Sequence, residues 1–392
     1  MAAPVGNLFI DTGLSQVCHH GEQACGDAIA FKRIAAEERL IAVLADGLGH
    51  GLKANILALM TTTMALRFCA EDRDLAHYAE IIMDALPVCQ IRNISYATFT
   101  IVDTRLGGVT RVVEMGNPEF LLLRDGNPVK LCGTESASPK YRDRVMTTYE
   151  FLAEPNDRIL IFSDGVTQSG LGSANFPLGW RDGGVSSYVA DLLATDPTVS
   201  AQELADRVLR EAIAHEPQRR PKDDISVASL YFRMPRKLLI FTGPPYDRER
   251  DAECARKFAD FDGKKIVAGG TSAEIIAREL GVSLEIDLKG YAGDLPPAAI
   301  MPGAELVTEG IFTLSRAAAY LESNAYSRDP AGRICDLLRS HDIIEFVVGT
   351  RINEAHQDPN LPVDLELRRN IVMRLVKILR EKYVKDVEIS FV

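Results

Sequence analysis

The chain has 392 residues, of which 46% are hydrophobic, and it carries a formal net charge of −11. This length exceeds what one hydrophobic core usually supports, so two domains are expected. The hydrophobic fraction excludes a disordered chain. The acidic balance disfavours nucleic acids and anionic membranes as partners, because negatively charged surfaces repel them.

Cysteine usage and the amino terminus indicate a reducing compartment. The seven cysteines are widely spaced and form no CxxC pair, which is typical of free thiols and argues against a cysteine-based zinc site. The first residues lack the basic stretch and apolar run of a signal peptide, and no segment approaches the roughly 20 apolar residues that span a bilayer. We therefore expect a cytoplasmic protein.

Residues 7–233 contain strands and helices in separate blocks. The apolar run 40–45 predicts a buried strand, and residues 52–69, without glycine or proline, predict a long helix. A second helix is expected at 74–86 and a third at 199–215. Further strands are expected at 96–102, 109–114, 120–124, 129–131, 158–163 and 225–232, and another is expected to begin at 149–151. This grouping predicts an α+β fold of layered sheets and helices.

Met234-Pro235 breaks the pattern, which places the domains at 1–235 and 236–392. Beyond the boundary, strands and helices alternate, as is typical of a smaller α/β domain. The strands are expected at 238–241, 265–268, 343–348 and 387–392, and the helices at 247–261, 272–280 and 365–382.

Two polar segments of the second domain have alternative interpretations. Gly269-Gly270-Thr271-Ser272, between a strand and a helix, either holds a phosphate at the helix N-terminus or forms a tight turn with an N-cap. The run 349–359, together with Glu309, forms either a small-ligand or metal pocket or a solvated connection. A sensory or regulatory role is the default expectation for this domain.

Several aspartates of the first domain lie at the ends of predicted strands or in turns. Asp46 and Asp164 each end an apolar strand and precede a glycine, Asp27 lies in a glycine-containing turn, and Asp223-Asp224 opens the last strand. Any one of these motifs alone is typical of a turn. Carboxylates that converge beyond a sheet edge repel one another unless a cation lies between them. Because Mg²⁺ and Mn²⁺ prefer carboxylate, carbonyl and water oxygens, the combined pattern indicates a site for such cations.

These motifs resemble the SpoIIE/RsbU-like branch of the PP2C (PPM) family of metal-dependent protein serine/threonine phosphatases. The resemblance covers residues 7–233 and implies a β-sandwich flanked by helices, with two Mn²⁺ or Mg²⁺ ions. The stretches that carry it are Cys25-Gly26-Asp27, LADGLGHG at 44–51, Gly116-Asn117-Pro118, FSDGV at 162–166 and KDDISV at 222–227.

The resemblance also implies a role for each matching residue. Asp46 would bridge both ions, and Gly47 would lend its carbonyl. Asp27 would bind one ion, whereas Asp164 and Asp223 would bind the other. Asp46 and Asp164 are the catalytic residues of this scheme, in which a water activated by two metals hydrolyses phosphoserine or phosphothreonine.

The choice between the two adjacent aspartates and the roles of the nearby histidines have alternative interpretations. Asp223 is favoured over Asp224 because the family's ligand lies three residues before a serine or threonine, here Ser226. His50 either protonates the leaving oxygen or only shapes the entry into the following helix. His19-His20 is expected at the surface or in a turn, because adjacent side chains on a strand point apart.

The branch suggests that the substrate is a phosphoprotein, namely an anti-sigma-factor antagonist in bacterial partner-switching signalling. Whether the protein forms a homodimer stays open. The alternative is a catalytically inactive PP2C-like scaffold that binds a phosphoprotein or a small ligand. Loss of a metal-binding aspartate would indicate a scaffold, and all four aspartates are present.

Overall fold

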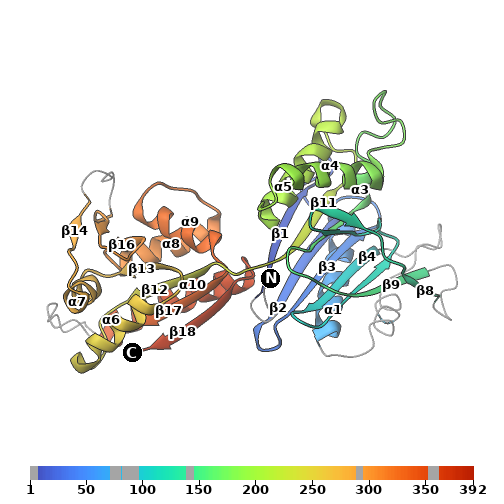
Figure 1. Ribbon diagram of the computed structural model, residues 1–392. Helices are drawn as coiled ribbons and strands as arrows, with labels where there is room; N and C mark the ends of the chain where they lie inside the picture. The colour runs from blue at the N-terminus through green and yellow to red at the C-terminus, as the bar shows by residue number, and fades with distance from the viewer. Residues whose placement is uncertain (1–7, 71–80, 82–96, 138–144, 288–294, 352–361) are drawn as a thin grey trace. The chain divides into compact units, whose positions relative to one another are not determined.

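A computed structural model describes residues 8–70, 81, 97–137, 145–287, 295–351 and 362–392 (Figure 1). The chain divides into two compact units, Met1–Met234 and Pro235–Val392. The helix expected at 74–86, except residue 81, and most of the polar run 349–359 lie outside the described residues. Of the helices that the structure describes, none combines the length and the apolar character needed to cross a lipid bilayer.

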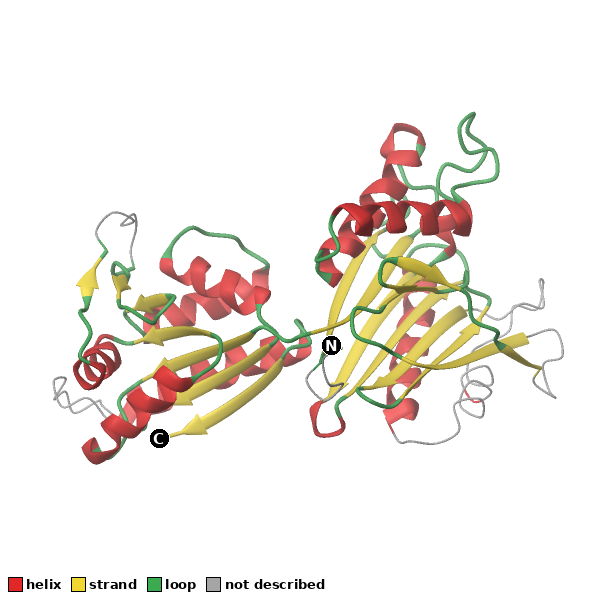
Figure 2. Cartoon of the chain, viewed as in Figure 1, coloured by secondary structure: helices red, strands yellow, loops and turns green. Residues whose placement is uncertain are grey.

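Two antiparallel sheets form the centre of the first unit (Figure 2). In the described residues, one sheet has the order β1-β11-β10-β6-β7 and the other β2-β3-β4-β5-β9-β8. The first comprises β1 (Phe9–Val17), β6 (Leu121–Arg124), β7 (Asn127–Val129), β10 (Arg158–Phe162) and β11 (Ile225–Arg233). The second comprises β2 (Asp27–Ile34), β3 (Arg39–Gly47), β4 (Ala97–Arg105), β5 (Val109–Met115), β8 (Thr134–Ala137) and β9 (Val145–Leu152).

Helices cover the two sheets separately. Helix α1 (Leu52–Ala70) packs on the second sheet through a face of small residues that includes Ala54, Ala58 and Ala65. Helices α4 (Arg181–Thr195) and α5 (Ala201–His215) pack on the first sheet, and the short α3 (Asp164–Thr167) follows β10. The described part of the unit is therefore a β-sandwich flanked by helices, which confirms the predicted α+β fold class.

The second unit contains a mainly parallel sheet, in the order β14-β15-β16-β13-β12-β17-β18 over the described residues. The neighbours from β16 to β18 pair in parallel, whereas β14 and β15 pair antiparallel. The strands are β12 (Lys237–Thr242), β13 (Lys264–Ala268), β14 (Glu285–Ile286), β15 (Ala299–Ile300), β16 (Leu306–Thr308), β17 (Ile343–Val348) and β18 (Asp386–Phe391).

Helices pack against this sheet in two hydrophobic clusters. One cluster joins the sheet to α8 (Ile311–Ser323), α9 (Pro330–Ser340) and α10 (Pro362–Glu381). The other joins it to α6 (Asp251–Asp260) and α7 (Gly270–Leu280). The parallel strands, numbered in chain order, have the spatial order 3-2-1-4-5, which is a doubly wound α/β arrangement.

Candidate metal centre

Asp27 and Asp46 occupy opposite positions on neighbouring strands. Asp27 is the first residue of β2 rather than part of a turn, and it pairs with Asp46 near the end of β3. Directly opposed side chains of an antiparallel pair lie on the same face, with Cβ atoms about 4.5–5.5 Å apart. The register of β2 and β3 therefore brings two carboxylates together.

The end of β3 approaches α1 so closely that a side chain has no room there. A Cβ atom on Gly47 would lie 2.2 Å from the carbonyl oxygen of Ala54. The N–H of Gly47 donates to the carbonyl oxygen of Gly26 at 3.1 Å, which ties β3 to the start of β2. Glycine at this position thus fixes the strand end that carries Asp46.

Asp164 reaches the same region from the other sheet. The strand β10 ends at Phe162, and Asp164 is the first residue of α3 rather than the last of the strand. The side-chain amide of Gln168 donates to its carboxylate at 2.7 Å. A Cβ atom on the next residue, Gly165, would lie 2.2 Å from the carbonyl oxygen of Asp224, so α3 packs directly on the segment that precedes β11.

The two adjacent aspartates before β11 have different roles. Asp224 is only 2% exposed, and its carboxylate accepts the backbone N–H groups of His19 and Gly26, both at 2.9 Å. It therefore anchors the loop that joins β1 to β2. Asp223 is half-buried and accepts the N–H of Asp224 at 2.9 Å.

Electrostatics show that the four aspartates share one environment. Burial and then the carboxylates of Asp27, Asp164 and Asp223 raise the pKa of Asp46 from 3.8 to about 9. Burial raises the pKa of Asp27 to about 7, although hydrogen bonds from the hydroxyls of Ser226 and Ser163 oppose this shift. Burial also raises the pKa of Asp164 and that of Asp223. Such a cluster disfavours its own ionisation unless a cation compensates the charge.

The donor set fits hard divalent cations. The Oδ2 atom of Asp27 is buried and has no hydrogen-bond partner, which is uncommon for a carboxylate oxygen. No three of these four aspartates, however, place carboxylate oxygens within 4.8 Å of one another. Among the described residues, the groups of three ligand atoms within 4.8 Å of one another are instead Cys18, Cys25 and Asp224, and His19, Glu22 and His50.

The histidines of the sequence motifs, His19, His20 and His50, lie near the aspartates in the loops after β1 and β3. His50 is exposed, and its Nδ1 atom lies 2.8 Å from Oε1 of Glu22. Its ring stacks on that of His19 at a centroid distance of 4.7 Å. Both His19 and His20 lie in the turn after β1. No sequence signal marks Glu22 or Gln168, because their contacts depend on the packing of distant segments.

The sequence matches the family model of Stage II sporulation protein E over residues 36–233, just over half of the chain. The chain belongs to the SpoIIE family. The resemblance inferred from the motifs is thereby confirmed, and the first unit has a phosphatase domain of the PP2C type. Asp46, Asp164 and Asp223 lie within the range matched to SpoIIE, whereas Asp27 precedes it.

Solved structures of SpoIIE-related proteins resemble part of the chain. The phosphatase domain of SpoIIE from Bacillus subtilis matches with 16% identity and a TM-score of 0.44, covering 58% of this chain and 94% of that one. The RsbU and RsbW domains of a protein from Mycobacterium tuberculosis match with 16% identity and a TM-score of 0.48, covering 64% and 67%. A complex of RsbX with magnesium matches with 17% identity and a TM-score of 0.41, covering 57% and 95%. No curated protein shows a significant match to the sequence.

Proposed function

We propose that the first unit is a metal-dependent protein serine/threonine phosphatase. The observation that carries this proposal is the convergence of carboxylates on Asp46, whose principal charged neighbours are Asp27, Asp164 and Asp223. The residues proposed to hold two Mn²⁺ or Mg²⁺ ions are Asp27, Asp46, Gly47, Asp164 and Asp223. Asp223 is preferred to Asp224 in this set because it lies three residues before Ser226, the spacing of the family's ligand, whereas the Asp224 carboxylate anchors the loop between β1 and β2.

When bound, a pair of such cations supplies a hydroxide nucleophile near neutral pH and offsets the charge of the phosphoryl oxygens. The chain's own contribution is to hold the ligands in place. The hydroxyls of Ser163 and Ser226 orient Asp27, and the amide of Gln168 orients Asp164. The close contact between Gly47 and Ala54 fixes the position of Asp46. Ligands held in this way lose little conformational freedom when a cation binds.

We assign phosphoserine or phosphothreonine of a phosphoprotein as the substrate. The family supports a place in bacterial partner-switching signalling, with an anti-sigma-factor antagonist as the substrate class. The units 1–235 and 236–392 then act as separate domains. The doubly wound sheet of the second favours ligand sensing, because such sheets bind small ligands at the carboxyl ends of their strands.

Phosphate release from a phosphoserine peptide tests the proposal. The full-length protein should turn over the peptide with Mn²⁺ or Mg²⁺, and EDTA should stop the reaction. Asp46→Ala and Asp164→Ala should be inactive, whereas Asp125→Asn, in the exposed turn between β6 and β7, should match the wild type. Peptide binding without turnover under all metal conditions would favour the inactive scaffold instead.

A further inference from the structure

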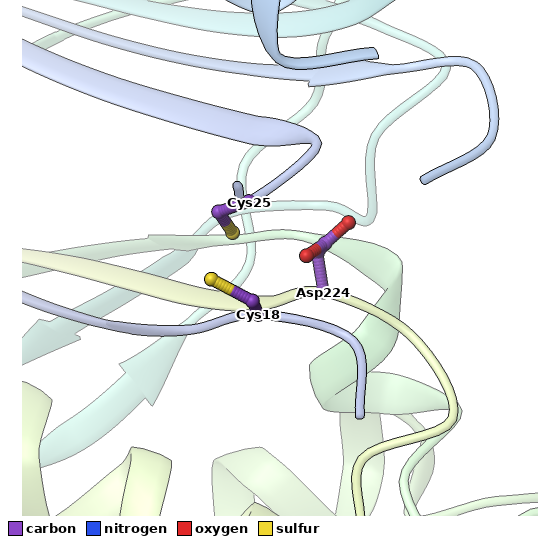
Figure 3. A group of neighbouring side chains, drawn as sticks. All are labelled: Cys18, Cys25 and Asp224. Atoms are coloured by element: carbon purple, nitrogen blue, oxygen red, sulfur yellow. The ribbon is translucent and has the colours of Figure 1, made fainter. Parts of the chain in front are cut away.

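A second group of potential metal-binding side chains, Cys18, Cys25 and Asp224, lies where the loop that joins β1 to β2 meets the segment before β11. Cys18 follows β1, Cys25 precedes β2, and Asp224 precedes β11. Their sulfur atoms and a carboxylate oxygen all lie within 4.8 Å of one another. Figure 3 shows the two sulfur atoms turned toward each other, with the carboxylate of Asp224 beside them. Three chain segments thus direct two thiols and one carboxylate at the same small space.

The chemistry of this set differs from that of the four aspartates. Thiolate ligands select soft or borderline ions such as Zn²⁺, whereas Mg²⁺ and Mn²⁺ favour oxygen. Zinc binds sulfur at about 2.3 Å and carboxylate oxygen at about 2.0–2.2 Å, so its tetrahedral ligands lie roughly 3–4 Å apart. The ligand atoms of Cys18, Cys25 and Asp224 lie within 4.8 Å of one another, so small side-chain rotations bring them to the spacing that zinc requires.

We propose that Cys18, Cys25 and Asp224 bind one zinc ion, with solvent in the fourth position. The backbone N–H groups of His19 and Gly26 each use one carboxylate oxygen of Asp224. An ionised carboxylate offers about four lone-pair sites, so further coordination remains open. Cys25 and Asp224 are buried, whereas Cys18 is half-buried and gives the ion a path from solvent.

The neighbouring group of His19, Glu22 and His50 is less suited to an ion. The two imidazole rings are stacked with an interplanar angle of 14°. Because the nitrogen lone pairs lie in the ring planes, two nearly parallel rings cannot point both lone pairs at one ion. The thiols have no such planar constraint, which is why the cysteine group carries the inference.

A zinc ion here would reinforce the scaffold of the proposed phosphatase centre. Cys25 lies two residues before Asp27, and Asp224 follows Asp223. The ion would therefore tie together the segments that carry two of the proposed ligands of the phosphatase centre. A ligand that binds only the folded state raises stability. Zinc is therefore expected to stabilise the first unit without taking part in the reaction.

Titration of the reduced, EDTA-treated full-length protein with Co²⁺ tests the site. The wild type should develop a thiolate-to-cobalt charge-transfer band that saturates near one equivalent and is displaced by Zn²⁺. The band should be lost in Cys18→Ser and Cys25→Ser. It should persist in Cys132→Ser, which removes an exposed thiol of the same unit.

Thermal unfolding provides the second measurement. Zn²⁺ should raise the melting temperature of the wild type and of Cys132→Ser, but not that of folded Cys18→Ser. Three results would overturn the site: no band in the wild type, a band retained in both serine variants at positions 18 and 25, or a native disulfide between Cys18 and Cys25. Mn²⁺-dependent phosphate release, measured separately, distinguishes failure of the zinc site from failure of the phosphatase proposal.

Discussion

Replacing Asp46 by asparagine removes the carboxylate on which the other aspartates converge. The structure predicts that this change makes the metal-free protein more stable, although it removes a proposed metal ligand. Folding raises the pKa of Asp46 from 3.8 to about 9, because the carboxyl group is buried beside other carboxylates. Asparagine has nearly the same shape and carries no charge, so it avoids this penalty.

The sign and size of the effect follow from proton linkage. A carboxyl group whose pKa is raised by folding contributes full stability below its unfolded pKa. That contribution is lost as the pH rises through its folded pKa, here the window from about 4 to about 9. At pH 7 the loss amounts to on the order of 2–4 kcal/mol, since each pKa unit corresponds to about 1.4 kcal/mol and neighbouring carboxylates share the proton. Asp46→Asn should recover most of it.

Urea unfolding of the EDTA-treated protein at pH 5 and pH 8.5 measures this difference. Trp180 is the single tryptophan of the chain and is 9% exposed within the first unit, so its fluorescence reports on that unit. Asp46→Asn should exceed the wild type in stability, and by more at pH 8.5. The exposed control Asp125→Asn should stay within about 0.5 kcal/mol of the wild type at both values. A variant less stable than the wild type at both pH values would refute the reasoning.

Two further comparisons use matched pairs of variants. Gly165→Ala places a Cβ atom 2.2 Å from the carbonyl oxygen of Asp224 and should lower the stability measured by urea unfolding by about 1–3 kcal/mol. Gly183→Ala, in α4 with nothing within 4 Å of the new Cβ, should be neutral or stabilising, and similar losses in both variants would contradict the packing argument. Asp223→Asn should lose Mn²⁺-dependent phosphate release. Asp224→Asn should chiefly lower stability, by about 1–3 kcal/mol, because it weakens one buried and one partly buried hydrogen bond. Loss of phosphate release in Asp224→Asn but not in Asp223→Asn would exchange the roles of the two residues.

The elements with the strongest apolar signal are predictable from the sequence. The apolar runs 40–45 and 159–162 are buried throughout and form most of β3 and β10, whose bounds the sequence predicts closely. Strand β1 was missed because its nine residues mix glycine, aspartate and serine with apolar residues. It is stabilised by pairing with β11 along its whole length, which no local pattern reveals. Helix α4 was missed because two adjacent glycines, at 183 and 184, weaken the helical signal.

Part of the candidate site is predictable from local motifs, and part depends on long-range strand pairing. The motifs predict Asp46 and Asp164 as site residues, because glycine after an apolar run marks the place where a strand ends. The spacing of Cys18 and Cys25 argued against a cysteine-based metal site. The structure nevertheless brings both thiols to Asp224, because pairing of β1 with β11 places the loop beside the start of that strand. Long-range pairing of this kind leaves no trace in local spacing.

The two-cation centre is tested most directly by calorimetric titration of the EDTA-treated, full-length protein with Mn²⁺. Binding of two Mn²⁺ ions per chain is predicted for the wild type, with both lost or strongly weakened in Asp46→Asn. Absence of Mn²⁺ binding, or unchanged binding in Asp46→Asn, would contradict the assignment of the four aspartates as a metal centre.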